Sequence, residues 1–202
     1  MRIHIRVALV LFFAEALLAA ATLHPQAASS ATSTNLALPE VAADFSYINS
    51  NVPVGGCGCF GVYGGSLTAA FPIARGAFAI VGDFTSGSST SIAPNSYHLT
   101  LSTVTAGARY SPNLHWGRYH PFAQATAGFA HASQDLVEGA GASVPNASAT
   151  FAADVGGGID LDLNRRFRLR LAQASYLLTT FDNGSNNRQN NLRLSAGLVF
   201  RY

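Results

Sequence analysis

The C-terminal segment Leu192–Tyr202 has the sequence LRLSAGLVFRY. Apolar residues alternate in it with polar or small residues, and it ends on an aromatic side chain. Because successive side chains of a β-strand point to opposite faces, this alternation predicts a strand with one apolar and one polar face. An ordinary edge strand is the alternative, but a long apolar edge on a soluble protein is an aggregation hazard. In hydrocarbon every backbone group must be bonded, so the last strand would have to pair with the first.

The same period-two alternation recurs upstream, and no segment shows a convincing helical period. Besides 192–202, the segments expected to form strands are 41–47, 62–71, 78–84, 97–110, 121–133, 151–163 and 167–171. Several of these run to about ten residues, long enough for a tilted strand to cross a bilayer. In 97–110 the apolar residues change parity, which predicts a β-bulge or a change of face near Ser102.

The connections between these eight segments alternate in length. Short connections are expected at 72–75, 111–119 and 164–166, and long ones rich in Gly, Ser, Asn and Pro at 49–59, 86–95, 134–147 and 182–190. Short turns on one side and long loops on the other are typical of an outer-membrane barrel. An even number of strands also returns both termini to the short-turn side.

The two faces of the strands differ in chemistry. One face carries large apolar groups such as Phe45, Leu67, Ile80 and Leu194. The other carries small residues and the charged residues Asp44, Asp83, Asp154, Asp160, Asp162, Arg168, Arg170, Arg193 and Arg201. A soluble barrel would be expected to carry more charges outside, whereas a narrow lumen lets carboxylates pair with guanidinium groups. We therefore predict an apolar exterior and a lumen charge network of Asp154, Asp160, Asp162, Arg168, Arg170 and Arg193.

Composition limits the class of protein further. The chain has 202 residues, of which only 11% are charged against roughly 25% in soluble domains, and it carries a formal net charge of +2. All 12 basic residues are arginine. A single folded domain is favoured by this length and hydrophobicity, and the absence of a basic run excludes nucleic acid as an expected partner.

The N-terminus resembles a secretory signal peptide. Arg2 and Arg6 precede the apolar stretch 7–23, which is followed by small residues. A membrane anchor helix is the alternative, but the stretch is short for a span of about 20 apolar residues and Glu15 interrupts it. We expect a signal peptide at 1–28, a linker at 29–40 and a barrel at 41–202. Cys57 and Cys59 are expected to form a local loop clip or to stay free thiols.

Several short motifs carry a family resemblance. They are Gly107–Ser111, Pro121-Phe122, Gly156–Asp160, Arg168–Gln173 with Tyr176, Asn190–Gly197 and the final Phe200-Arg201-Tyr202. In these the chain resembles the small bacterial outer-membrane β-barrel family, whose members include the transmembrane domain of OmpA-type proteins. The resemblance implies an all-β, eight-stranded antiparallel up-and-down transmembrane barrel in the outer membrane. It also implies that Phe200 and Tyr202 belong to the signal read by the barrel-assembly machinery.

An eight-stranded barrel is just wide enough for its side chains to fill, whereas an aqueous channel needs about sixteen strands. The sequence therefore predicts a non-enzymatic barrel, structural or surface-interacting, with outer-membrane lipids and the assembly machinery as partners. No catalytic residue, cofactor or metal is assigned, and the sequence names no extracellular partner.

Two other functions stay open. His131 and Ser133 share one face of a strand, with Asp135 and Glu138 just beyond, and a Ser, a His and a carboxylate are what acyl hydrolysis needs. The segment Phe129–Ser133 is similar to the His-x-Ser pair of outer-membrane lipid A deacylases, although the residues after it differ. The second alternative is a soluble, lipocalin-like barrel that binds a small apolar ligand.

Overall fold

The computed structural model describes residues 38–51, 59–73, 77–92, 97–112, 116–135, 147–181 and 188–202. The expected signal peptide, most of the linker and Cys57 lie outside these residues. Nothing in the described part of the chain is a helix long and apolar enough to span a membrane.

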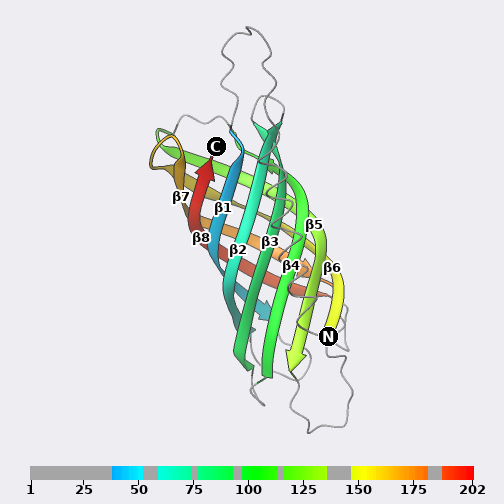
Figure 1. Ribbon diagram of the computed structural model, residues 1–202. Helices are drawn as coiled ribbons and strands as arrows, with labels where there is room; N and C mark the ends of the chain where they lie inside the picture. The colour runs from blue at the N-terminus through cyan, green and yellow to red at the C-terminus, as the bar shows by residue number, and fades with distance from the viewer. Residues whose placement is uncertain are drawn as a thin grey trace, which may run out of the picture. The chain divides into compact units, whose positions relative to one another are not determined.

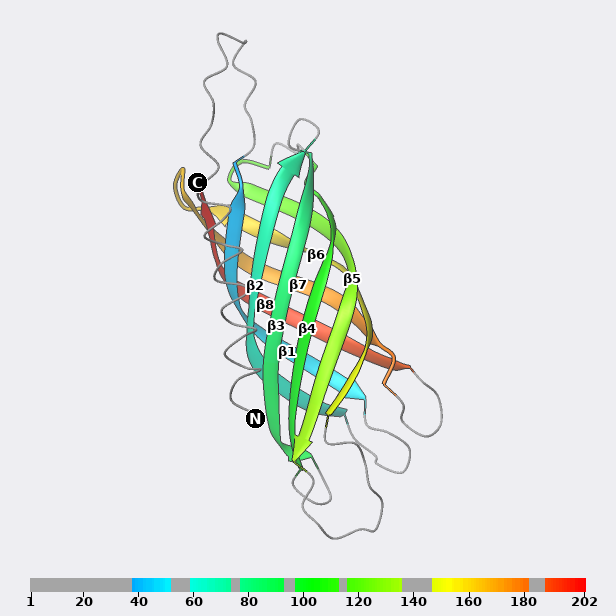
Figure 2. The ribbon, with the colours of Figure 1, turned by 45° about the vertical axis from the view of Figure 1, so that its right-hand side comes forward.

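Eight antiparallel strands form one closed barrel (Figure 1). They are β1 (Glu40–Asn51), β2 (Cys59–Ile73), β3 (Phe78–Ile92), β4 (Tyr97–Tyr110), β5 (Tyr119–Asp135), β6 (Ala147–Asp162), β7 (Phe167–Thr179) and β8 (Gln189–Arg201). Each strand pairs with its neighbours in the chain, and the strongly tilted strands of both walls are visible in Figure 2. The predicted fold class, an eight-stranded up-and-down barrel, is confirmed.

The barrel closes where β1 pairs with β8. Phe45 lies opposite Ala196, and Tyr47 lies opposite Leu194. A Cβ atom added at Gly197 would lie 2.5 Å from the Cα of Asp44, so the two strands approach closely only because this residue is glycine. Closure leaves no unpaired strand edge in the described sheet, as a strand in hydrocarbon requires.

The barrel has an apolar exterior and a polar interior. Phe45 is 60% exposed, and Leu67, Ile80 and Leu194 are 55%, 56% and 43% exposed. The alternating residues between them point inward and are buried. The polarity predicted from the sequence is therefore confirmed, and it is the reverse of that in a soluble barrel. A lipocalin-like protein, which needs a polar exterior, does not fit.

The predicted β-bulge near Ser102 is wrong. Strand β4 pairs with β5 without a register shift, and Leu101 points inward and is buried. The parity change in the sequence arises because the lumen contains apolar residues, Leu101 among them, at the end of the barrel that carries the long loops. Register shifts occur elsewhere: on β7, where Leu171 and Ala172 are both exposed and the register shifts against both neighbouring strands, and between Ser89 and Ile92 on β3.

One predicted long loop is also shorter than expected. Segment 86–95 was expected to connect two strands, but β3 continues to Ile92 and β4 begins at Tyr97. Residues 86–91 of β3 are only serine, glycine and threonine, so no alternation marks this part of the strand, and its pairing with β4 reaches Ile92 after a register shift between Ser89 and Ile92. The hydroxyl groups of Ser86 and Ser102, opposite each other, form a hydrogen bond of 2.9 Å.

Candidate functional site

The lumen contains two buried ionic groups, and the first surrounds Arg170. Its Nη1 donates to Asp44 Oδ2 at 2.9 Å and to Gln173 Oε1 at 3.2 Å, and its Nε donates to Asp160 Oδ1 at 3.0 Å. Arg170 and Asp160 come from the adjacent strands β7 and β6, whereas Asp44 comes from β1. The guanidinium group therefore joins three strands, and it is completely buried.

An aromatic ring supports this group from the short-turn side of the lumen. The guanidinium carbon of Arg170 lies 4.8 Å from the centre of the Phe122 ring, and that of Arg109 lies 4.4 Å from it. Arg109 also donates to Gln124 Oε1 at 2.8 Å. A Cβ atom at Gly158 would lie 2.8 Å from the ring, so the glycine leaves the space that Phe122 occupies.

The second ionic group surrounds Arg193 on β8. Its Nη1 donates to Asp83 Oδ1 and to Thr85 Oγ1, both at 2.8 Å, and its Nε lies 3.6 Å from Asp154 Oδ2. Ser175 donates a further hydrogen bond of 2.8 Å to Asp154. Because Asp83 is on β3 and Asp154 is on β6, the arginine connects opposite walls of the barrel. Buried charges of this kind are tolerated when they are paired and hydrogen-bonded.

A third, half-exposed ionic group lies at the short-turn rim. Asp162 accepts from Arg168 Nε at 2.7 Å, lies 2.9 Å from Arg201 Nη2 and contacts His120 Nε2 at 2.7 Å. Arg168 also pairs with Glu40, the first residue of β1. Glu40 was expected in the linker, but it is paired with Ala70 on β2 and Arg201 on β8, so the barrel begins one residue earlier.

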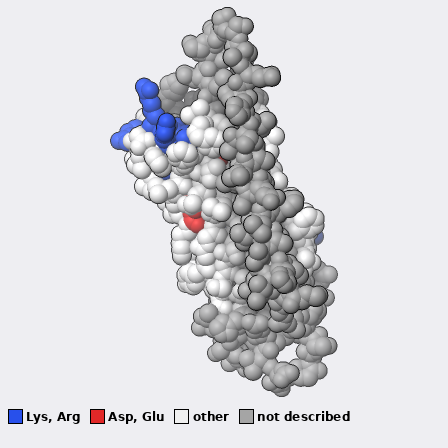
Figure 3. Space-filling view, in the orientation of Figure 1, with Lys and Arg blue, Asp and Glu red and all other residues white. Residues whose placement is uncertain are grey.

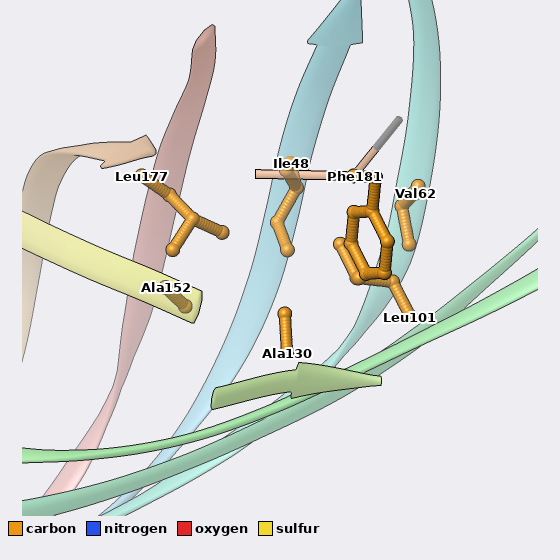
Figure 4. Close-up of a cluster of buried hydrophobic side chains, with 7 residues drawn as sticks. All are labelled: Ile48, Val62, Leu101, Ala130, Ala152, Leu177 and Phe181. Carbon is orange, nitrogen blue, oxygen red and sulfur yellow. The ribbon is translucent and has the colours of Figure 1, made fainter. Parts of the chain in front are cut away.

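An apolar cluster fills the lumen toward the long loops (Figure 4). Its members come from β1, β2, β4, β5, β6, β7 and the residues after β7, and they are Ile48, Val62, Leu101, Ala130, Ala152, Leu177 and Phe181. In Figure 4 these side chains converge from different parts of the wall. A species that entered from the long-loop side would have to pass this cluster before it reached the ionic groups.

The structure brings the predicted charged residues together in three groups, not in one network on the last three strands. Arg170 and Asp160 share the first group, Arg193 and Asp154 the second, and Arg168 and Asp162 the rim. Sequence reasoning placed Asp44 and Asp83 on the polar face but left them out of the network, and it missed Glu40 and Arg109. The alternation along the strands was enough to place Asp44 and Asp83 on the inward face. The arginine that each carboxylate meets across the lumen could not be predicted from the sequence.

His131 and Ser133 lie on the outside of the barrel. His131 is exposed, Ser133 is partly exposed, and Ala132 between them packs toward the apolar cluster. They follow Phe129, which is 71% exposed. The structure does not describe the side chain of Asp135 or any part of Glu138. Among the described residues, no group of three potential ligands could hold a metal ion.

The C-terminal aromatic residues extend along the exterior at the short-turn end. The ring centre of Phe200 lies 5.3 Å from that of Phe167 on β7 and 6.2 Å from that of Tyr202. The backbone nitrogen of Tyr202 donates to Pro39 O at 3.2 Å, beside the start of β1. The two residues to which the family resemblance gives an assembly role therefore lie next to the seam that closes the barrel.

Exposed aromatic residues form two girdles around the apolar exterior. The girdle near the short turns contains Phe71, Phe78, Tyr110, Tyr119, Phe167 and Phe200, and the one toward the long loops contains Tyr63, Phe129, Phe151 and Tyr176. An outward apolar band between aromatic girdles is a property of transmembrane β-barrels. The fold and the exterior together define the class: this is a small transmembrane β-barrel of the outer-membrane type.

Comparison with solved structures supports this class. The chain is similar to the Neisserial surface protein A, NspA (19% identity, TM-score 0.59, covering 81% of this chain and 97% of that chain). It is also similar to Ail, the attachment invasion locus protein of Yersinia pestis (15% identity, TM-score 0.53, covering 82% and 99%), which has also been solved with the heparin analogue sucrose octasulfate. No family model and no curated protein matches the chain. The shared fold confirms the predicted resemblance to small outer-membrane β-barrels.

Proposed function

We propose that this protein is a non-enzymatic outer-membrane barrel whose lumen is sealed by its own side chains and whose long loops form the contact surface outside the cell. The short turns would face the periplasm, as they do in outer-membrane barrels. The observation that carries the proposal is the filled lumen, in which Arg170, Arg193 and the apolar cluster succeed one another along the barrel.

The filled lumen opposes conduction for two reasons. The guanidinium groups of Arg170 and Arg193 are each held by two carboxylates from different strands, so an ion could pass only by breaking buried pairs. Breaking one such pair costs about 3–5 kcal/mol. Toward the long loops, the apolar cluster offers an ion no polar ligand in exchange for its hydration, and the buried polar side chains at this end, Ser50, Thr179 and Asn191, already hydrogen-bond to one another.

The wild-type barrel is therefore expected to give no regular channel steps in a planar lipid bilayer, where a sixteen-stranded porin serves as the positive control. Insertion of the barrel would be checked by its heat-modifiable gel mobility. Regular single-channel steps from the inserted wild-type protein would contradict a sealed lumen.

The long loops and the C-terminal residues complete the proposal. The sequence at the long-loop end contains Asp135, Glu138 and Asp182 but only Arg188 among the basic residues. This excess of acidic residues disfavours a sulfated ligand like the heparin analogue found with Ail, so we propose a neutral or cationic surface partner. We also propose that Phe200 and Tyr202 present the C-terminal strand to the barrel-assembly machinery.

One observation keeps a lipid hydrolase as a second candidate. His131 and Ser133 both face outward beyond the girdle residue Phe129, where a lipid could reach them. On our proposal the purified protein releases no fatty acid from lipid A or from phospholipid, and Ser133→Ala gives the same background as the wild type. Release by the wild type that is abolished in Ser133→Ala would replace the non-enzymatic proposal with the hydrolase.

A further inference from the structure

Three exposed arginines lie together at the short-turn end of the barrel. They are Arg118, in the connection before β5, and Arg165 and Arg166, in the turn between β6 and β7. Figure 3 shows a cluster of basic side chains at this end, while the described wall below it is almost entirely uncharged. We call these three residues the rim arginines.

The turn that carries two of them is firmly held. Asn164 Oδ1 accepts hydrogen bonds from the backbone nitrogens of Arg166 and Phe167, at 2.8 and 2.9 Å. Arg118 Nε donates to Asp162 O at 2.8 Å, and Arg201 Nη2 donates to Asn164 O at 2.7 Å. The backbone of the turn is therefore fixed by neighbouring side chains, and it presents Arg165 and Arg166 to the surroundings.

The positive charge of the rim arginines is not neutralised locally. Among the described residues, none of the three forms an ion pair with a carboxylate. The nearest acidic residue in the sequence, Asp162, already pairs with Arg168 and Arg201 and contacts His120. The guanidinium groups of Arg165 and Arg166 are thus available to an anionic partner outside the barrel, whereas that of Arg118 adds its positive charge while it donates to Asp162 O and Leu163 O.

The position of the rim arginines at the edge of the apolar exterior indicates which kind of anionic partner they could meet. Trp116 and Tyr119 flank Arg118 in the sequence, Phe167 follows Arg166, and all three aromatic side chains are exposed. Aromatic rings at the ends of a membrane-spanning segment lie at the depth of the lipid headgroups. Arginine side chains at this level lay their stems along the apolar surface and place the charge among the headgroups.

We propose that the rim arginines bind the phosphate groups of anionic phospholipids in the leaflet that surrounds the short-turn end. The planar guanidinium group matches phosphate oxygens with two parallel hydrogen bonds, and the chain uses arginine for every basic residue. The proposal rests on the membrane placement proposed above and adds a lipid preference to it. Anionic lipids collect around basic residues at a membrane surface, and two of the three arginines have no competing contact within the described residues.

The proposed lipid preference can be tested by fluorescence, because the single tryptophan of the chain, Trp116, is two positions before Arg118. Barrels would be inserted into phosphatidylcholine vesicles that contain a small fraction of headgroup-labelled dansyl lipid, either phosphatidylglycerol or phosphatidylcholine carrying the same dye. Energy transfer from Trp116 to the dye then reports which lipid collects at the rim. The wild type is expected to transfer to the anionic label at least about twofold more efficiently than to the zwitterionic label.

Two variants decide the outcome. Arg165→Gln with Arg166→Gln is expected to abolish the excess transfer, whereas Arg188→Gln, which removes an exposed arginine at the opposite end, is expected to keep it. Equal transfer to both labels in the inserted wild type would overturn the proposal and leave the rim as a solvated or protein-binding surface. Loss of the excess in Arg188→Gln as well would also overturn it, because net charge would then be the cause. Heat-modifiable gel mobility shows independently whether the barrel is inserted. A wild-type barrel that fails to insert would contradict the proposed function, whereas an inserted barrel without a lipid preference would contradict only this inference.

Discussion

Replacing Arg170 with methionine is expected to lower the free energy of unfolding by about 3–5 kcal/mol. The substitution keeps much of the side-chain volume but leaves the carboxylates of Asp44 and Asp160 without their cation in a buried site. It also removes one of the two guanidinium groups that contact Phe122. The measurement is equilibrium unfolding in urea, with the barrel in vesicles and the fluorescence of Trp116 as the signal.

The matched control is Arg166→Met, which makes the same chemical change at an exposed position; both variants are measured in phosphatidylcholine vesicles, so that no anionic lipid is present for Arg166 to bind. Its effect is expected to stay within about 0.5 kcal/mol. Adding Asp44→Asn and Asp160→Asn to Arg170→Met is expected to recover a large part of the lost stability, because no uncompensated charge then remains inside. If Arg170→Met and Arg166→Met were equally stable, the ionic groups in the lumen would not hold the barrel together.

Placing a charge on the exterior at Leu194 is expected to cost about 2–4 kcal/mol, the cost known for arginine or lysine at the midplane of a bilayer. Leu194 lies near the middle of β8, is 43% exposed and faces away from the lumen. Leu194→Arg therefore exposes a guanidinium group to hydrocarbon without changing any lumen contact. The free energy of unfolding would be measured from vesicles in the same way.

Leu163→Arg provides the comparison at the edge of the membrane. Leu163 is 45% exposed, as Leu194 is, but it lies in the turn after β6. There an added arginine is expected to cost only about 0–1 kcal/mol. Equal costs at the two positions would mean that the exterior does not contact hydrocarbon, and the assignment to a membrane would fail.

Only part of the candidate site could be predicted from the sequence. The inward parity of Asp154, Asp160, Arg170 and Arg193 followed from the strand pattern, because alternation is a local property of an extended chain. The bulge expected near Ser102 was wrong because Leu101 faces the lumen, and a leucine in a lumen and a leucine in lipid look the same in a sequence. The cluster of rim arginines was not predicted, because Arg118 is far in sequence from Arg165 and Arg166.

The sequence by itself determined the number of strands and the reversed polarity, since both depend only on the two-residue period and on composition. The tertiary structure decided which charges meet. Arg170 and Asp44 are 126 positions apart, and Arg193 and Asp83 are 110 apart, so their pairing depends on how the closed sheet staggers its strands. The bulge at Leu171 and Ala172 then turns Gln173, Ser175 and Leu177 inward. Stagger and closure are properties of the whole barrel, because the register of each strand is set by both of its neighbours.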